Sequence, residues 1–402
     1  MAGHAASSHP AAPYRRILIV GGGCIGLTTA ISVLEAKLTQ NVLIVADRFS
    51  PMTTTNQSGA VRTVTLAPTA FLPISHDHTD HLATPSTFSH AHSQLWRPVF
   101  LGDGPGEAEK VQRWGQVCFD RYVAELEQHG GDRTGIAIVP GYDLYREAAA
   151  PALPLWRTTV RDFAVCAPAE IRPAWRAAGI RHAHSYRSVI AEPTRYMQFL
   201  HSRFEALGGR YHRIARVQSR AELVALASRF DADAVVNCTG LGARETAGDA
   251  SVFPVRGQTV KVTLPPGEAQ DHFLICPDDD FLAYVFPRSA DVLLGGTHTD
   301  HDARTAVSGE DTRGIVDRCA QLVAWDIRAA AVQFVSCGLR PARPSVRCER
   351  DADADASVTR LVHNYGHGGA GMTLHWGCAR DVVDMLREDQ PKQQKAHARA
   401  RL

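Results

Sequence analysis

Short apolar runs that end in glycine dominate the first part of the chain. Residues 17–20, Ile-Leu-Ile-Val, form one such run and lead directly into three glycines. A continuous run of this length is typical of a strand that helices cover on both faces of a parallel sheet. Residues 27–36 then have the composition of a helix, and residues 41–45 form a second apolar run. This order predicts a βαβ unit.

Similar signals recur further along the chain. Residues 234–238 and 292–294 are apolar runs that end at glycine, and the glycine-rich residues 366–371 lead into a helical pattern over 372–386. Helical spacing, ended by two glycines, predicts a further helix around Tyr196, Phe199, Leu200, Phe204 and Leu207. These segments extend the α/β pattern to the end of the chain.

The periodicity disappears between residue 68 and about residue 110. This stretch is rich in Pro, Ser, Thr and His, a composition typical of loops, and we expect a long surface insertion. Residues 1–14 and 391–402 are expected to be flexible tails. The first of these has no apolar segment of the kind found in a secretory signal.

Composition limits the classes of protein that fit. A chain of 402 residues exceeds one ordinary core and indicates two domains. The formal net charge of +1 gives no reason to expect a nucleic acid or an anionic membrane as partner. No apolar stretch has the length of a membrane-spanning helix. The nine cysteines include no CxxC pair, so we expect buried single thiols in a reducing compartment.

The first motif with chemical meaning is Gly21-x-Gly23-x-x-Gly26, which follows a predicted strand and opens a predicted helix. Such glycines allow a tight turn, a close approach of the backbone to a pyrophosphate, and close packing of helix and strand. Asp47 lies about 20 residues further on, as expected for a carboxylate that binds a ribose hydroxyl. A purely structural turn is the alternative, and the motif alone does not separate FAD from NAD.

Four ordered blocks between residues 16 and 380 resemble the D-amino-acid oxidase and D-aspartate oxidase family. They are the fingerprint with residues 46–49 and 53–55, then residues 236–242 with 253–258, then 338–344, and finally 363–373 with 375–377. The second block is most similar to the D-aspartate oxidases. The resemblance implies that the cofactor is FAD.

The resemblance also implies the architecture. We expect an α/β protein in which a Rossmann-type FAD-binding domain is interleaved with a mixed α+β substrate domain built on a largely antiparallel sheet. Residues 15–64, 190–255 and 338–390 are expected to form the FAD-binding domain, and residues 65–189 and 256–337 the substrate domain.

Cofactor contacts carried over from the resemblance gather at the glycine turn, at the end of the second strand and in the later blocks. They are Gly21, Gly23, Cys24, Ile25, Gly26, Asp47, Arg48, Thr53, Thr54, Thr55, Ser58, Gly59, Val217, Thr239, Gly240, Arg340, Gly368, Gly369, Gly371, Met372 and Thr373.

Three residues match the family's substrate-binding groups. Arg340 matches the arginine that binds the α-carboxylate, a task suited to the guanidinium fork. Tyr284 matches a tyrosine whose hydroxyl meets the same carboxylate, and the carbonyl of Gly369 matches the acceptor of the amino group. The alternatives from sequence are a surface ion pair for Arg340 and core packing for Tyr284.

The chemistry implied by the resemblance is hydride transfer from the substrate Cα to flavin N5. The overall reaction converts an amino acid, O2 and water into a 2-oxo acid, ammonia and hydrogen peroxide. It requires no Ser/His/Asp or Cys/His set, because alignment and electrostatics suffice when the cofactor carries the chemistry.

Signals for the substrate side chain conflict. Arg62 and His298 are candidates for contact with a distal carboxylate, which favours D-aspartate or D-glutamate. A flavin phosphate or a nearby aspartate is the alternative partner of Arg62. The acidic run of residues 278–280 replaces a tyrosine lid seen in relatives and favours a basic substrate. Neutral or basic D-amino acids, secondary amines such as sarcosine, and a silent FAD-binding protein remain alternatives.

A rival motif lies in the expected insertion, where residues 76–81 spell His-Asp-His-Thr-Asp-His. This HxHxDH string resembles the zinc ligands of the metallo-β-lactamase fold. The downstream ligand blocks of that fold are missing, so a zinc hydrolase is the disfavoured alternative and no catalytic metal is expected.

The last residues, Ala400-Arg401-Leu402, are similar to a Ser-Lys-Leu peroxisome signal. They predict a peroxisomal location, with the import receptor as a partner, and otherwise a cytoplasmic one. A homodimer is left open.

Overall fold

A computed structural model describes residues 12–49, 94–98, 106–352 and 360–388. Several predictions lie outside these residues, namely the sites at Thr53, Thr54, Thr55, Ser58, Gly59 and Arg62, the HxHxDH string and the Ala400-Arg401-Leu402 tripeptide. They stay predictions. Among the described residues, no helix is long and apolar enough to cross a membrane.

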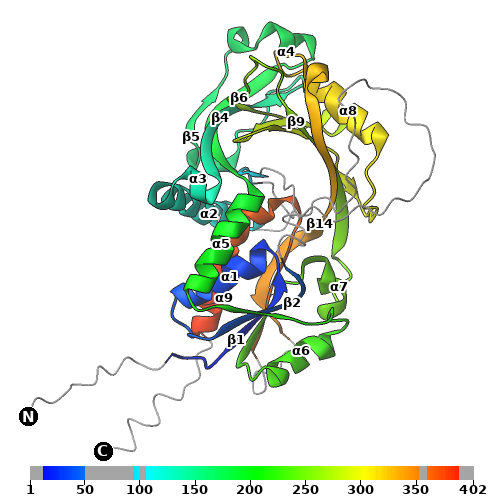
Figure 1. Ribbon diagram of the computed structural model, residues 1–402. Coiled ribbons are helices and arrows are strands. Elements are labelled where there is room, and N and C mark those ends of the chain that lie inside the picture. The colour runs from blue at the N-terminus through cyan, green and yellow to red at the C-terminus, as the bar shows by residue number, and fades with distance from the viewer. Residues whose placement is uncertain (1–11, 50–93, 99–105, 353–359, 389–402) are drawn as a thin grey trace, which may run out of the picture.

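One half of the molecule is a parallel sheet with helices on both faces (Figure 1). Its strands run in the order β15-β8-β1-β2-β7 and pair in parallel. The bounds are β1 Ile17–Gly22, α1 Cys24–Glu35, β2 Val42–Phe49, α5 Pro193–Ala206, β7 Arg210–Arg213, α6 Arg220–Arg229, β8 Ala234–Asn237, α7 Ala243–Thr246, β15 Arg360–His367 and α9 Gly371–Glu388.

Strand β1 shows why the apolar run folds this way. Its first four residues are at most 2% exposed. Ile17 and Ile19 join the core cluster that contains α1 and α9, whereas Leu18 and Val20 join the cluster formed with α6. Alternate side chains of a strand point to opposite faces, so a run without polar residues is buried only between two helical layers.

The other half is a largely antiparallel sheet in the order β3-β6-β4-β10-β11-β12-β9-β14. The bounds are β3 Gln94–Leu95, β4 Ile136–Tyr145, β5 Arg161–Val165, α4 Pro173–Ala177, β6 His182–Ala191, β9 Phe253–Thr263, β10 Phe273–Cys276, β11 Ala283–Pro287, β12 Val292–Gly295, β13 Thr299–Asp300, α8 Gly309–Ala320 and β14 Ala331–Arg350. The expected fold class is thereby confirmed.

Strand β14 belongs to both halves of the sheet. Its first part pairs with β9 and its last part with β15, and Ala342 is the residue that faces both Phe253 of β9 and His367 of β15. In Figure 1 this strand runs from the upper sheet down to the lower one. The two halves therefore form one continuous sheet.

Helix α2, Glu107–His129, is followed by the short α3, Gly131–Thr134. Trp114 and Arg113 of α2 both donate hydrogen bonds to Asp381 of α9 at 2.7 Å. The Tyr122 hydroxyl donates to the carbonyl of Met372 at 2.8 Å. The expected boundaries assign α2 to the substrate domain, whereas its side chains pack on a helix of the half with the parallel sheet.

The expected surface insertion is wrong at its C-terminal end. Leu95 and Trp96 are 8% and 2% exposed, and β3 pairs with the edge strand β6. Residues 107–110 already belong to α2. The sequence before Leu95 contains few apolar residues, so the pattern gave no sign that a buried segment follows. That segment is short and contributes few side chains to the core.

Burial of His375 should make the stability of the protein depend on pH. The imidazole is fully buried, with Nε2 3.0 Å from the Tyr122 hydroxyl, and burial lowers its pKa to about 3. In the unfolded chain, His375 takes up a proton below about pH 6.5. The free energy of unfolding therefore keeps its full value with respect to this residue above that pH and decreases as the pH falls. At about pH 5 this histidine alone should lower the free energy of unfolding by about 2 kcal/mol.

Urea-unfolding midpoints measured at about pH 7.5 and about pH 5 would test this prediction. His375→Gln should reduce the difference between the two midpoints, because glutamine does not titrate. His212→Gln, at an exposed position, should leave the difference as in the unmodified protein. Equal differences in all three proteins would contradict the assignment.

Candidate active site

The turn between β1 and α1 fits a dinucleotide pyrophosphate. Gly21 has a φ of +127°, and a Cβ there would lie 2.3 Å from the carbonyl oxygen of Cys238. A Cβ on Gly26 would lie 2.0 Å from the Gly21 oxygen, whereas one on Gly23 would meet nothing within 4 Å. Gly21 and Gly26 are thus required by the close packing of the backbone, whereas Gly23 faces open space.

The N-terminus of α1 completes this turn. Its N-cap, Gly23, provides no side-chain hydrogen bond, and the first turn carries no acidic residue. The start of α1 therefore presents backbone N–H groups at the positive end of the helix dipole, an arrangement that binds phosphate.

The other expected cofactor contacts lie near this edge of the parallel sheet. Asp47 and Arg48 lie near the carboxyl end of β2, with side chains 43% and 64% exposed. The Thr239 hydroxyl donates to Asn237 Oδ1 at 2.7 Å, which fixes the turn into Gly240. Val217 is buried. The exposed carboxylate of Asp47 fits the expected contact with a ribose hydroxyl.

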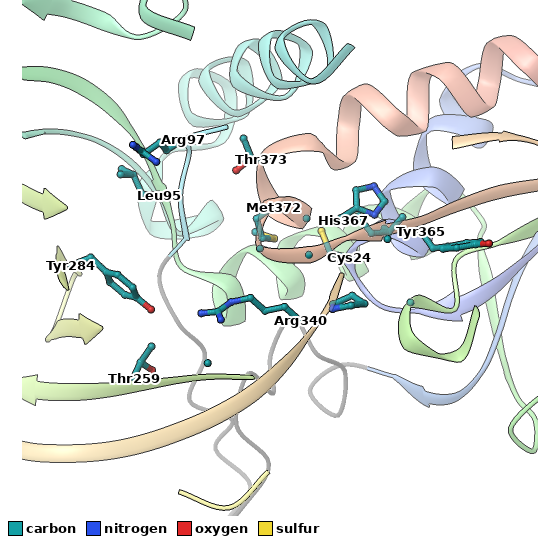
Figure 2. Close-up of a pocket in the computed structure, with 18 of the residues that line it drawn as sticks. Cys24, Leu95, Arg97, Thr259, Tyr284, Arg340, Tyr365, His367, Met372 and Thr373 are labelled. Carbon is teal, nitrogen blue, oxygen red and sulfur yellow. The ribbon is translucent and has the colours of Figure 1, made fainter. Parts of the chain in front are cut away.

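A cavity of about 290 Å³ opens where the two halves of the sheet meet (Figure 2). Expected site residues form much of its wall, namely Cys24, Ile25, Gly240, Tyr284, Arg340, Gly368, Gly369, Gly371, Met372 and Thr373. Residues far apart in the sequence thus surround one space.

Arg340 and Tyr284 reach the cavity across glycines. A Cβ on Gly257 would lie 2.2 Å from Nη1 of Arg340, and one on Gly295 would lie 1.9 Å from Cζ of Tyr284. Only glycine at these positions lets the two long side chains lie flat over neighbouring strands. Figure 2 shows the Tyr284 hydroxyl directed toward the Arg340 guanidinium.

The local electrostatics keep both groups ready to bind an anion. Burial raises the pKa of Tyr284, and the nearby Arg340 charge only partly offsets this, so the phenol stays protonated and can donate. Arg340 Nη1 also donates to the carbonyl of Thr297 at 3.3 Å, which restricts the guanidinium. Two donors therefore converge at one end of the cavity.

The loop after β15 brings backbone groups to the same place. A 3-10 turn, Gly368–Ala370, leads into α9, whose first turn carries no acidic residue. A Cβ on Gly369 would lie 3.6 Å from Cδ of Arg340. The positive end of α9 thus faces the cavity and can stabilise negative charge there.

His367, at the end of β15, also lines this wall. Burial lowers its pKa to about 3, so the ring is neutral near pH 7. Its Nε2 is buried and has no hydrogen-bond partner among the described residues. A buried polar atom of this kind at the wall of the cavity suits a site that a polar ligand completes.

His298 is not brought into this site. Its side chain is 58% exposed, and Nε2 lies 3.1 Å from Asp300 Oδ1. It is absent from the described wall of the cavity. The structure therefore gives no support for the expected contact between His298 and a substrate carboxylate, because the exposed ring lies beside Asp300 instead.

The acidic run proposed as a lid is held by a basic partner. Asp280 Oδ2 lies 3.1 Å from Nη1 of Arg146, and the backbone N–H of Arg146 donates to Asp278. The same guanidinium lies 4.6 Å from the ring centroid of Phe281. The negative charge of this segment is thus offset locally, which weakens the argument for a basic substrate.

Several residues of the wall were missed by sequence reasoning. They are Leu95, Arg97, Cys238, Gly257, Thr259, Ile275, Phe286, Leu293, Pro341, Asn364, Tyr365, Gly366 and His367. Leu95 and Arg97 belong to a Leu-Trp-Arg-Pro string, and the return of apolar and aromatic residues after the polar stretch was the signal that could have located them.

Within the described ranges, no group of three or more His, Cys, Asp or Glu side chains could hold a metal ion. The residues of the HxHxDH string lie outside those ranges.

Comparison with known proteins places the chain among flavin enzymes. The profile of a family described as FAD dependent oxidoreductase matches residues 16–385. Human D-aspartate oxidase is 29% identical over 374 residues, which cover 93% of this chain and 95% of the human one. The D-amino-acid oxidase of Rubrobacter xylanophilus is 36% identical over 276 residues, covering 68% and 78% of the two chains.

Solved structures show the same fold. Glycine oxidase from Geobacillus kaustophilus matches with a TM-score of 0.63 at 17% identity, over 94% of this chain and 96% of that one. Glycine oxidase from Bacillus cereus matches with a TM-score of 0.61 at 15% identity, over 95% and 97%.

Substitutions at Gly23 and Gly26 should distinguish an effect on cofactor binding from an effect on folding. Gly23→Ala places a methyl group in the open space expected to hold the pyrophosphate, and it should weaken FAD binding by at least about tenfold while the protein folds normally. Gly26→Ala creates a backbone clash and should lower the thermal midpoint as well. Flavin fluorescence titration and thermal unfolding would measure the two effects. Unweakened FAD binding by Gly23→Ala would contradict this reading.

Proposed function

The chain belongs to the family of FAD-dependent oxidoreductases whose profile matches residues 16–385, and from this premise we propose that it is an oxidase of D-amino acids. The observation that carries the proposal is the pairing of Arg340 and Tyr284 in the wall of a cavity that is also lined by the start of α1 and the start of α9. This arrangement suits a small carboxylate held against a flavin.

The residues present fit FAD. The open backbone at Gly23 and the N-terminus of α1 suit its pyrophosphate, and Asp47 suits its ribose. Gly368, Met372 and Thr373 line the part of the cavity at the N-terminus of α9, where the ring system would lie. Bound FAD supplies an acceptor for the hydride that leaves the substrate α-carbon.

The chain itself binds and orients the substrate. Arg340 pairs with the α-carboxylate through two N–H groups, and Tyr284 donates a further hydrogen bond. The carbonyl of Gly369 accepts from the neutral amino group, whose lone pair assists departure of the hydride. With three attachment points the α-carbon has a fixed orientation, which distinguishes one enantiomer from the other.

Apolar side chains exclude water from the reacting carbon. Ile275, Phe286 and Leu293 line the cavity and are at most 8% exposed, and the rings of Phe286 and Tyr284 stack with centroids 4.8 Å apart. Overall, the amino acid, O2 and water yield a 2-oxo acid, ammonia and hydrogen peroxide. The imine forms first, and water hydrolyses it after it has left the apolar cavity.

Acidic D-amino acids are the favoured substrates. The similarity to human D-aspartate oxidase supports this choice, as do the two guanidinium groups, those of Arg97 and Arg340, that line the cavity. Neutral or basic D-amino acids and secondary amines such as sarcosine are the alternatives.

Peroxide release across a panel of amino acids would test the proposal. We expect activity with D-aspartate or D-glutamate and none with their L-enantiomers, from a yellow protein that releases FAD on denaturation. A protein that binds FAD but oxidises no D-amino acid would refute the proposed function, while activity confined to sarcosine would favour the alternative.

Removal of the guanidinium of Arg340 should abolish most turnover but not cofactor binding. In Arg340→Ala we expect kcat/KM to fall by about 1000-fold or more, because a charge-assisted bidentate pair both binds and aligns the substrate. Tyr284→Phe removes one hydrogen bond and should cost about tenfold. Arg350, on the same strand as Arg340, pairs with Glu388 and donates to the carbonyl of Met385 in α9. Arg350→Ala is the matched control and should keep its activity. Near-normal kcat/KM in Arg340→Ala would rule out the assignment.

A further inference from the structure

The wall of the cavity beyond Arg340 contains a second arginine whose role the proposed reaction leaves open. Leu95 lies in β3, and Arg97 follows it by two residues. In Figure 2, Leu95 and Arg97 lie on one side of the cavity, and Tyr284 and Arg340 lie on another. A ligand held by Arg340 therefore shares this space with Arg97.

The described part of the cavity wall carries a net positive charge. Among the residues that the structure describes there, Arg97 and Arg340 carry formal charges near pH 7, and no carboxylate accompanies them. The α-carboxylate of an amino acid compensates one guanidinium. The second guanidinium would face the side chain of the substrate. A substrate with a negative group on that side chain would then be favoured.

Arg97 is held from behind by a buried carboxylate. Its Nε donates to Asp143 Oδ2 at 2.9 Å, and its side chain is 21% exposed whereas that of Asp143 is 0% exposed. Asp143 also accepts from the hydroxyls of Tyr186 at 2.8 Å and Tyr145 at 3.3 Å. The hydrogen bond to Asp143 uses the Nε of the guanidinium, and the Tyr145 hydroxyl also interacts with this guanidinium. The Nη side of the fork is the part that can meet a ligand.

The surroundings fix both the charge and the direction of this fork. Burial opposes the charge of Arg97, but Asp143 more than offsets it and raises the pKa of the guanidinium. Burial, reinforced by Asp143, also raises the pKa of Tyr186, so the phenol remains a donor to the carboxylate. The Cζ of Arg97 lies 5.8 Å from the ring centroid of Trp156. Such a preorganised cation loses little entropy when it binds an anion.

Asp143 does not cancel this preference. Its negative charge is shared among three donors and it is absent from the described wall of the cavity, whereas Arg97 is part of that wall. Asp143 pairs along the sheet with Ile275, whose side chain does line the cavity. A ligand thus meets the guanidinium and an apolar neighbour, and the carboxylate acts as a support.

We propose that Arg97 recognises the side chain of the substrate and that the enzyme is specific for dicarboxylic D-amino acids. The inference rests on the proposed oxidase function and adds to it a specificity residue. Arg97 pairs with the distal carboxylate while Arg340 holds the α-carboxylate, and Asp143 is a positioning residue.

Paired ligands that differ in a single charge would test this inference. We expect the unmodified holoenzyme to prefer D-aspartate to D-asparagine in kcat/KM, and Arg97→Gln to lower that ratio by about 10- to 100-fold. Binding of succinate and succinamate, followed by the change in flavin absorbance, gives the same comparison without turnover. Arg97→Gln should weaken succinate binding by a similar factor and leave succinamate binding little changed.

Controls separate recognition from folding. The double variant Arg97→Gln/Asp143→Asn removes both charges of the buried pair and avoids an unpaired carboxylate, and it should show the same loss of preference. Arg121→Gln breaks a comparable pair with the buried Glu125 in α2 and should keep the ratio.

The outcomes distinguish a failure of the Arg97 inference from a failure of the oxidase proposal. An unchanged ratio in Arg97→Gln, or an unmodified enzyme that prefers D-asparagine or D-alanine, would overturn the role of Arg97 and leave the oxidase proposal intact. A holoenzyme that oxidises no D-amino acid, yet binds succinate over succinamate through Arg97, would instead refute the oxidase proposal and support the assignment of Arg97.

Discussion

The architecture depends on the continuous pairing of strand β14 with two different partners. The strand has 20 residues, pairs first with β9 and then with β15, and changes partner at Ala342. Backbone hydrogen bonds along this strand fix the antiparallel sheet relative to the parallel one. Arg340 lies two residues before the change, so its side chain is delivered to the junction by the same hydrogen bonds that join the two halves. The cavity exists because a single strand crosses that junction.

Small residues and buried charges then shape the space that this junction leaves. Glycines at positions 257 and 295 allow Arg340 and Tyr284 to lie across neighbouring strands. Behind the wall, the carboxylate of Asp249 accepts from Tyr365 and Arg343 at 2.9 Å each, and these donors, with Ser251, hold its pKa at about 2 despite burial. Polar groups buried without partners would destabilise the fold, so each such network also fixes the orientation of the residues in front of it.

Local signals in the sequence were sufficient for several of the elements and for the glycine turn. The run Ile-Leu-Ile-Val at residues 17–20 becomes β1, and the glycines that follow adopt the geometry that their spacing predicts. The resemblance added Arg340, Tyr284 and Gly369, which the structure does bring to one cavity. His298 fell outside it, because a match to a family position does not fix the direction of a side chain, and the ring here lies beside Asp300.

The sequence pattern by itself therefore determined the βαβ opening and a glycine turn suited to a dinucleotide, since both depend on residues within about one helix length of one another. The resemblance implied the fold class and FAD. Only the tertiary structure decided that α2 packs on α9 and that Arg97 shares a cavity with Arg340. Those contacts join segments separated by more than 200 residues, and Arg97 follows a polar stretch whose composition predicted a surface loop. Strand pairing at the sheet edge, which no local pattern encodes, brings that segment to the cavity.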